Sequence, residues 1–177
     1  MFELKISDLS DALWLSEDWA THTVSLLDPD IENYDIEIPV AGKDGQLRRY
    51  YFHDILSIDE LDDLIVLLEN PTLATSQQVQ EILEFTAPLQ STDKLLVHCQ
   101  AGVSRSTAVA CGVLCQHGLT PDEAVNYVFS IREIAFPNEH VLTLFDDILG
   151  LEGKLVAAGS EEIVEQFRQN NLPDLGQ

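Results

Sequence analysis

Three side chains near the middle of the chain have the types and spacing of a nucleophile beside an anion site. Cys99 ends a short apolar run, Arg105 follows six positions later with Gly102 between them, and Ser106 comes directly after the arginine. A cysteine thiolate is a nucleophile, and an arginine guanidinium can grip two phosphate oxygens at once. Hydrolysis of a phosphate ester through a cysteinyl-phosphate is the leading reaction that needs both groups together.

The residues around Cys99 also predict how the anion site is built. Residues 94–98 are expected to form a strand that delivers the sulfur to the carboxyl end of a sheet, where open α/β folds bind ligands. A helix expected from Ser106 points its N-terminus at the same place, and small loop side chains leave backbone amides free to face inward. This environment favours the thiolate form of Cys99. The loop consists of Gln100, Ala101, Gly102, Val103, Ser104 and Arg105.

The charge of the whole chain contrasts with this local site. Its 177 residues include 31 acidic and 9 basic side chains, which give a formal net charge of −22. Nucleic acids and anionic membranes bind basic surfaces, so neither is an expected partner. The positive potential that phosphate needs must therefore come from backbone amides, a helix end and Arg105.

The composition predicts one cytoplasmic domain over 1–177, and the pattern of its last part predicts a C-terminal helical extension over 151–177. Apolar residues make up 45% of the chain, no apolar run is long enough to span a membrane, and the first residues do not resemble a signal peptide. Cys111 and Cys115 lie one helical turn apart and are interpreted as core residues rather than a disulfide. No Cys/His pairs recur at zinc spacing, so no metal is expected.

Strand patterns come early in the chain and helical patterns late, with a strand–loop–helix unit in the centre. This order predicts an α/β fold in which helices flank a central, mostly parallel sheet. Strands are expected over 2–6, 21–27, 47–53 and 94–98. Helices are expected over 7–15, 59–69, 75–89, 106–117, 121–133, 138–149 and 161–169, with Leu9, Leu13 and Trp14 facing inward in the first.

The central motif resembles the H-C-x-x-G-x-x-R-S signature of the protein tyrosine phosphatase superfamily. Here it reads His98-Cys99-Gln100-Ala101-Gly102-Val103-Ser104-Arg105-Ser106. It is similar to the dual-specificity-like branch in particular, including the bacterial members of that branch. Pro137-Asn138 before an apolar helix resembles the P-N element that follows the signature there. The resemblance covers roughly residues 21–150 and implies a cysteine-dependent phosphatase fold that works without a cofactor.

The resemblance also implies roles for the matching residues. Cys99 would be the nucleophile, Arg105 the phosphate clamp, and Ser106 the hydroxyl that assists breakdown of the thiophosphate. His98 would either tune Cys99 or serve as a satisfied core histidine at a strand end. Asn138 would buttress the loop or the substrate side.

The general acid has to come from elsewhere in the chain. The family places an aspartate on a loop after an upstream strand, and Asp54 matches this position after an aromatic stretch. Asp54 lies 45 residues before Cys99, a longer gap than in compact family members, which an acidic insertion over 57–70 would explain. Asp59, Asp62 and Asp63 are rivals, although the solvated face of an amphipathic helix explains them better. A chain without a working acid is the third alternative.

The expected substrates are phosphate monoesters on proteins. No long phosphotyrosine-recognition loop precedes the catalytic region, so the pocket should be shallow and open to phosphotyrosine, phosphoserine or phosphothreonine. The loop interior is uncharged, which argues against the phosphoinositide and polyphosphate substrates of the superfamily, and a small phosphorylated metabolite stays open. Two other functions also stay open: a phosphate-binding pseudophosphatase, and a redox or sulfur-transfer protein that uses Cys99.

Overall fold

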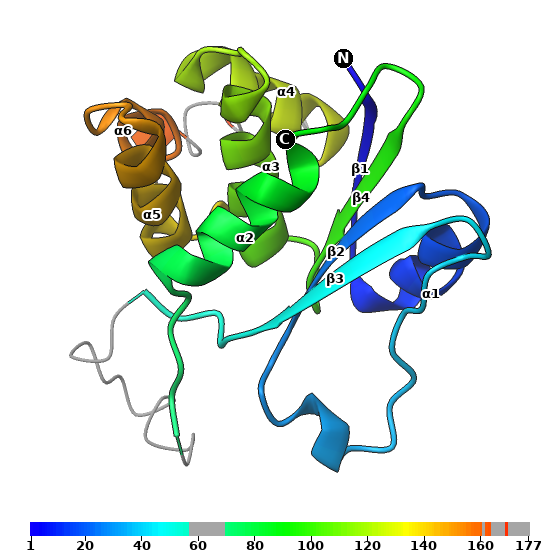
Figure 1. Cartoon of the computed structure of the whole chain (residues 1–177). Coiled ribbons are helices and arrows are strands. Elements are labelled where there is room, and N and C mark those ends of the chain that lie inside the picture. Colours follow the sequence, from blue (N-terminus) through cyan, green and yellow to red (C-terminus); the bar gives the residue numbers. More distant parts are fainter. Residues whose placement is uncertain (57–69, 161, 164–168, 170–177) are drawn as a thin grey trace, which may run out of the picture.

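A computed structural model describes residues 1–56, 70–160, 162, 163 and 169 of the chain. In this part, a four-stranded sheet lies between helices (Figure 1). The strands are β1 (Glu3–Ser7), β2 (His22–Leu27), β3 (Gln46–Tyr51) and β4 (Lys94–His98). The helices are α1 (Leu9–Asp18), α2 (Ser76–Thr86), α3 (Arg105–Gln116), α4 (Pro121–Ile131), α5 (Glu139–Leu149) and α6 (Lys154–Ala158), with a short 3-10 helix η1 (Ile31–Asn33).

The strand order places the site at one edge of the sheet. The order is β1-β4-β2-β3, and each neighbouring pair is parallel. His98 at the end of β4 is level with Ser7 of β1 and Ser25 of β2. Because parallel strands end at the same edge, the residues that follow β4, β2 and β3 emerge close together. The predicted α/β fold with a central parallel sheet is confirmed.

The two faces of the sheet bury different layers. Helices α2 to α6 cover one face and α1 covers the other (Figure 1). Strand β4 shows the alternation directly, because Leu95 and Val97 join the large core while Leu96 packs with Ala12 and Leu15 of α1. The side chains of Leu95, Leu96 and Val97 are fully buried. Cys99 therefore directly follows a strand that is packed on both faces.

Capping residues begin three of the helices where the sequence pattern predicts them. Thr75 and Gln78 form a capping box on α2, and Thr120 and Glu123 form another on α4, where Pro121 occupies the first helical position. The side chain of Asn138 accepts a hydrogen bond from the amide of Val141 and caps α5. These local signals explain why the helix starts were predictable.

Besides shifts of a few residues at the ends of elements and the unexpected helix η1, the structure differs from the sequence prediction in two places. Trp14 was expected to face inward but is 52% exposed, because the buried stripe of α1 consists of Ala12, Leu15 and Ser16. Helix α6 was not expected as a separate element, since it has only five residues and no side-chain cap, yet its Leu155 is fully buried. The helix expected over 59–69 and most of the one over 161–169 lie outside the described residues.

All three cysteines are free thiols. Cys111 is buried in the core and Cys115 is half-buried at its margin. Burial raises the pKa of Cys111, and burial with the nearby charge of Asp146 raises the pKa of Cys115 to about 11. Both thiols thus stay protonated at neutral pH, as core residues would. In the described part of the chain, no helix is long and apolar enough to cross a membrane.

Candidate active site

The sulfur of Cys99 lies at the floor of a tight loop between β4 and α3. Cys99 is 1% exposed. The backbone amide of Gly102 donates a hydrogen bond to Sγ over 3.2 Å, and the hydroxyl of Ser106 lies 3.3 Å from the same sulfur. The loop therefore curls around the sulfur with an amide and a hydroxyl facing inward, as the sequence predicts for residues 100–106.

Gly102 is required by both its conformation and its surroundings. Its φ of +65° lies in the left-handed region, where a side chain is strained. A Cβ atom there would lie 2.6 Å from the carbonyl carbon and oxygen of Ser7. The amide of Leu9 also donates to the carbonyl of Gln100 over 3.1 Å. The loop is thus packed directly against the junction of β1 and α1, and glycine is the residue that allows this approach.

Arg132, at the end of α4, holds the outer side of the loop. Its Nε donates to the carbonyl of Gly102 over 2.9 Å, and its Nη2 donates to the carbonyl of Ala101 over 3.0 Å. Carbonyls that are held outward leave the amides of the same peptide groups facing inward. Sequence reasoning missed Arg132. The available signal was its position shortly before Pro137-Asn138, as one of 9 basic residues in a strongly acidic chain.

Arg105 is a buried cation, and the two edges of its guanidinium group have different surroundings. The side chain is 2% exposed, and its Nη1 donates to Oδ1 of Asp28 over 2.7 Å and to the carbonyl of Phe52 over 2.6 Å. On the other edge, Nη2 has a long contact of 3.5 Å with Oε1 of Gln100, and the buried Nε has no hydrogen-bond partner among the described residues. A buried donor without a partner is costly, and an anion oxygen would satisfy it.

Asp28 is the second residue that sequence reasoning missed. It directly follows β2, and its carboxylate makes the shortest ion pair to Arg105 in the described part of the chain. Nothing in the local sequence marks it, because Asp28-Pro29-Asp30 has the composition of an ordinary turn. The parallel sheet brings it to Arg105 from 77 positions away.

Asp54 lies at the mouth of the loop. Its Oδ1 accepts hydrogen bonds from the hydroxyl of Ser104 over 2.6 Å and from Nδ2 of Asn138 over 2.9 Å, and its Oδ2 lies 3.8 Å from Nε of Arg105. One carboxylate oxygen is thus fixed by neutral donors while the other faces Arg105. The side chain remains 34% exposed. The rivals Asp59, Asp62 and Asp63 lie outside the described residues.

Asn138 connects three parts of the site. Its Oδ1 caps α5, its Nδ2 donates to Asp54 and, over 3.4 Å, to the carbonyl of Ile55, and its amide donates to the carbonyl of Ser104 over 3.3 Å. The side chain is 3% exposed, so these contacts are shielded from water. Asn138 thus joins the start of α5, the sulfur loop and the segment that carries Asp54.

His98 is buried beneath the loop and neutral at physiological pH. Burial lowers its pKa to about 4, and the positive charges of Arg49 and Arg105 act in the same direction. Its Nδ1 lies 3.4 Å from the carbonyl of Cys99, an acceptor, and Nε2 has no hydrogen-bond partner among the described residues. A neutral imidazole supplies no positive charge to the sulfur. His98 is thus a buried histidine at a strand end, but not a fully satisfied one, because Nε2 lacks a partner among the described residues.

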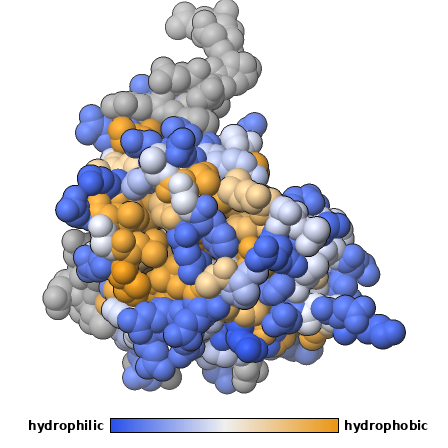
Figure 2. Space-filling view, turned by 45° about the horizontal axis from the view of Figure 1, so that its top comes forward, coloured by the Kyte–Doolittle hydropathy of each residue, from blue (hydrophilic) through white to orange (hydrophobic). Residues whose placement is uncertain are grey.

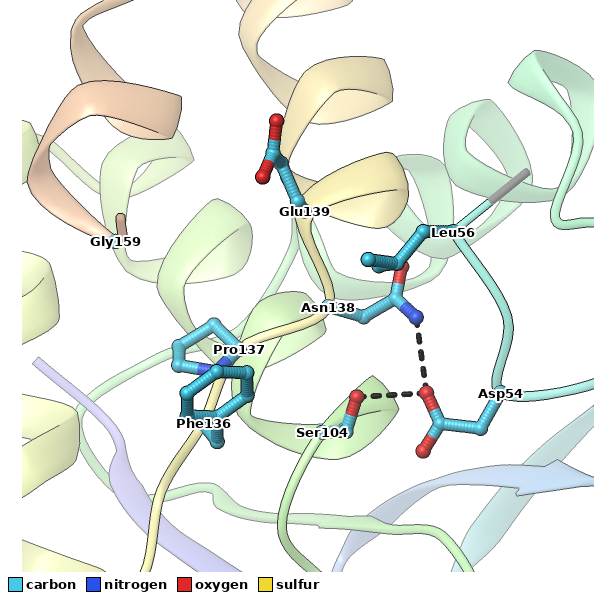
Figure 3. Close-up of a pocket in the computed structure, with 8 residues that line it drawn as sticks. All are labelled: Asp54, Leu56, Ser104, Phe136, Pro137, Asn138, Glu139 and Gly159. Carbon is cyan, nitrogen blue, oxygen red and sulfur yellow. Dashed lines mark hydrogen bonds between the residues drawn. The ribbon is translucent and has the colours of Figure 1, made fainter. Parts of the chain in front are cut away.

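A cavity of about 330 Å³ opens beside Asp54 (Figure 3). The P-N element forms one wall, and the segment that carries Asp54 forms the other. The lining residues are Asp54, Leu56, Ser104, Phe136, Pro137, Asn138, Glu139 and Gly159. The cavity thus adjoins the sulfur loop through Ser104 and Asp54.

A parallel sheet that presents a cysteine in an amide-lined loop, followed by an arginine on a helix, defines the class of cysteine-dependent phosphatase folds. Residues 31–146 match the dual specificity phosphatase catalytic domain, which confirms the resemblance found in the sequence. The chain belongs to this family.

Individual relatives agree with this assignment. The chain is 35% identical over 72 residues to mouse dual specificity protein phosphatase 2, a match that covers 40% of this chain and 23% of that protein. The match therefore spans about a quarter of the length of the curated relative.

Solved structures share the fold at low sequence identity. PTPMT1 in complex with PI(5)P is 15% identical with a TM-score of 0.59, and the match covers 89% of this chain and 95% of that one. The human tyrosine phosphatase-like serine/threonine/tyrosine-interacting protein is 19% identical with a TM-score of 0.59, covering 84% and 91%. Human DUSP28 is 21% identical with a TM-score of 0.55, covering 84% and 92%.

Proposed function

We propose that this protein hydrolyses phosphate monoesters through a phosphocysteine intermediate on Cys99. The observation that carries the proposal is the loop itself, where a buried sulfur meets the amide of Gly102 and the hydroxyl of Ser106 next to a buried arginine with a free donor edge. A thiolate at a helix N-terminus and beside an arginine is an activated nucleophile. Membership of the dual specificity phosphatase family supports the same chemistry.

In the first step, the Cys99 thiolate attacks phosphorus. A sulfur–phosphorus bond forms, the ester phosphorus–oxygen bond breaks, and its electron pair goes to the leaving oxygen. That oxygen takes a proton from the carboxyl group of Asp54, which lies at the loop mouth within 3.8 Å of Arg105. A positioned acid of this kind contributes about 10²–10⁴-fold to the rate.

In the second step, water attacks the phosphocysteine. The Asp54 carboxylate takes a proton from the water, the sulfur–phosphorus bond breaks, and inorganic phosphate leaves. The Ser106 hydroxyl, 3.3 Å from the sulfur, donates a hydrogen bond to the departing thiolate. Cys99 and Asp54 thus act in both steps without a cofactor.

Arg105 binds the phosphoryl oxygens through its Nε and Nη2 edge. Asp28 and the carbonyl of Phe52 occupy Nη1 and fix the plane of the guanidinium. Two parallel N–H donors in a fixed plane match two phosphate oxygens and strengthen as the transition state spreads its charge. Asp28 therefore acts as a positioning residue for Arg105.

Phosphoproteins are the proposed substrates. Phosphotyrosine comes first, and phosphoserine and phosphothreonine are included because the site is partly open to solvent. Gln100, Ala101, Val103 and Ser104 give the loop no charged side chain, which suits a single phosphate rather than a polyphosphate. A small phosphorylated metabolite is the alternative substrate.

The test is turnover of an aryl phosphate in EDTA by the wild type and by Cys99→Ser. We expect hydrolysis by the wild type, inhibition by vanadate, and no turnover by Cys99→Ser. A chain that binds vanadate but never turns over would instead be a phosphate-binding pseudophosphatase. Sulfur transfer that survives in Arg105→Ala would indicate the third function.

A further inference from the structure

The cavity beside Asp54 has the properties of a substrate subsite. Its volume of about 330 Å³ is at the lower end of ligand pockets, and Leu56, Phe136 and Pro137 give it apolar walls (Figure 3). The space suits one large side chain rather than an extended ligand.

The position of the cavity links it to the leaving group. In the proposed mechanism Asp54 protonates the leaving oxygen, so the group attached to that oxygen lies against Asp54. The amide of Phe136 donates to the carbonyl of Val103 over 2.9 Å, which places Phe136 directly beside the sulfur loop. A residue next to the phosphorylated one in a polypeptide therefore reaches the cavity as the phosphate enters the loop.

Two of the cavity walls are large apolar side chains that remain open to water. Leu56 is 50% exposed and Phe136 is 36% exposed. On the face drawn in Figure 2, apolar side chains also reach the surface between hydrophilic ones, so exposed apolar groups are not confined to the cavity. Exposed apolar groups that line a cavity gain free energy when an apolar partner covers them.

Charge at the cavity selects against acidic partners. Among the described residues that line it, Asp54 and Glu139 are ionisable and none is a lysine or an arginine. Glu139 is exposed in the first turn of α5. Asp54 is protonated when substrate binds in the proposed mechanism, so an acidic side chain in the cavity would meet like charge from Glu139, within a chain of net charge −22.

We propose that this cavity binds a large apolar side chain adjacent to the phosphorylated residue of a polypeptide substrate and that Glu139 excludes acidic neighbours. The proposal rests on the proposed phosphatase function. It makes Phe136 and Glu139 specificity-determining residues rather than catalytic ones.

The experiment compares matched phosphopeptides that differ at the residue beside the phosphorylated one, Leu, Ala or Glu, and uses phenyl phosphate as the reference substrate. For the wild type, we expect kcat/KM to be roughly 10-fold higher for the Leu peptide than for the Ala peptide, and the Glu peptide to be poorest. Phe136→Ala should remove most of the Leu preference, and Glu139→Gln should improve the Glu peptide selectively.

Matched controls separate the cavity from general effects. Ile134→Ala removes a side chain that is 52% exposed on the same segment but does not line the cavity. Glu84→Gln makes the same charge change as Glu139→Gln on helix α2, at an exposed residue that does not line the cavity. Both should leave the peptide ratios unchanged.

Several results would overturn the proposal. Equal kcat/KM for the three peptides would do so, as would controls that shift the ratios as much as the cavity variants. If part of this chain fills the cavity instead, Phe136→Ala would lower Tm and leave the peptide ratios unchanged, which also contradicts it. Absence of phenyl phosphate turnover would mark failure of the phosphatase function instead, so the two failures are distinguishable.

Discussion

At the scale of single residues, the site is organised around one buried cation. Arg105 is the only arginine or lysine in the described part of the chain that is nearly inaccessible to water, at 2% exposure. Its contacts with Asp28 and with the carbonyl of Phe52 lie on one edge of the guanidinium. A buried charge needs a fixed partner, and fixing one edge orients the other.

The first prediction concerns Asp28. Asp28→Ala should raise both KM for an aryl phosphate and the inhibition constant of vanadate by about 10- to 100-fold, because a misplaced guanidinium no longer matches the oxyanion. Asp28→Glu should recover part of the loss, and Asp30→Asn, two positions along the same turn, should cause none. Unchanged vanadate affinity in a folded Asp28→Ala protein would remove Asp28 from this role.

The second prediction concerns the acid. Asp54→Asn should lower kcat by about 10²–10⁴-fold for substrates with poor leaving groups and much less for those with good ones, because only a basic leaving oxygen needs the proton. The descending alkaline limb of the wild-type pH profile should disappear. Steady-state kinetics across a leaving-group series checks both, and equal losses for all leaving groups would argue against Asp54.

The residues of the site differ in how far they could be predicted from the sequence. Cys99, Arg105 and Ser106 sit in one short motif whose spacing encodes the loop, so their juxtaposition was predictable. Asp54 was proposed from the family resemblance, because it follows an upstream strand as the acid of the family does, and the structure places it beside the loop. Asp28 could not be found this way, because its contact with Arg105 depends on β2 lying beside β4, which no local pattern specifies.

At the scale of elements, the loop is held from two sides. The junction of β1 and α1 packs against Gly102, and the end of α4 holds the carbonyls of Gly102 and Ala101 through Arg132. The bounds of β4 and the start of α5 follow from local sequence signals, whereas these contacts arise from packing between elements far apart in the chain. The anion site is therefore a product of the whole sheet-and-helix arrangement rather than of the motif alone.

The third prediction tests the α4 contact. Arg132→Gln should weaken vanadate binding and raise KM about 10-fold or more, because freed carbonyls let the inward amides lose their alignment. Arg48→Gln makes the same charge change at an exposed arginine that packs over Phe85, and it should leave both values as in the wild type. Equal effects of the two variants would mean that the weaker vanadate binding comes from the change in net charge and not from the contact between Arg132 and the loop.

At the scale of the whole molecule, the net charge of −22 disfavours the binding of an anion, which is what the proposed site requires. Backbone amides, a helix N-terminus and Arg105 supply the local positive potential that offsets this charge at the site.

His98 connects the site to the stability of the fold, because it is fully buried at the end of the central strand β4. Because the imidazole is buried, it is neutral in the folded protein.

The fourth prediction follows from the pKa of His98. The folded pKa of about 4 lies below the ordinary value of 6.5, so the unfolded chain binds a proton first as pH falls. The stability from keeping this imidazole neutral is fully present above about pH 6.5 and is lost as pH falls toward about 4, by up to roughly 3 kcal/mol.

Urea unfolding between pH 4 and pH 7 measures this effect. His98→Gln should flatten the loss of unfolding free energy over that window relative to the wild type, whereas His22→Gln, at a half-buried ring, should keep the wild-type slope. The comparison between variants removes the contribution of the many carboxylates, which is common to all three proteins. Identical slopes for all three would contradict a neutral buried His98.

Acid quenching during turnover of a radiolabelled aryl phosphate tests the central role of Cys99 most directly. The label should be recovered on the peptide that contains Cys99, in an acid-stable thiophosphate bond, and it should be absent from Cys99→Ser. Steady turnover with no trapped label, or label on a different residue, would contradict a phosphocysteine at this loop.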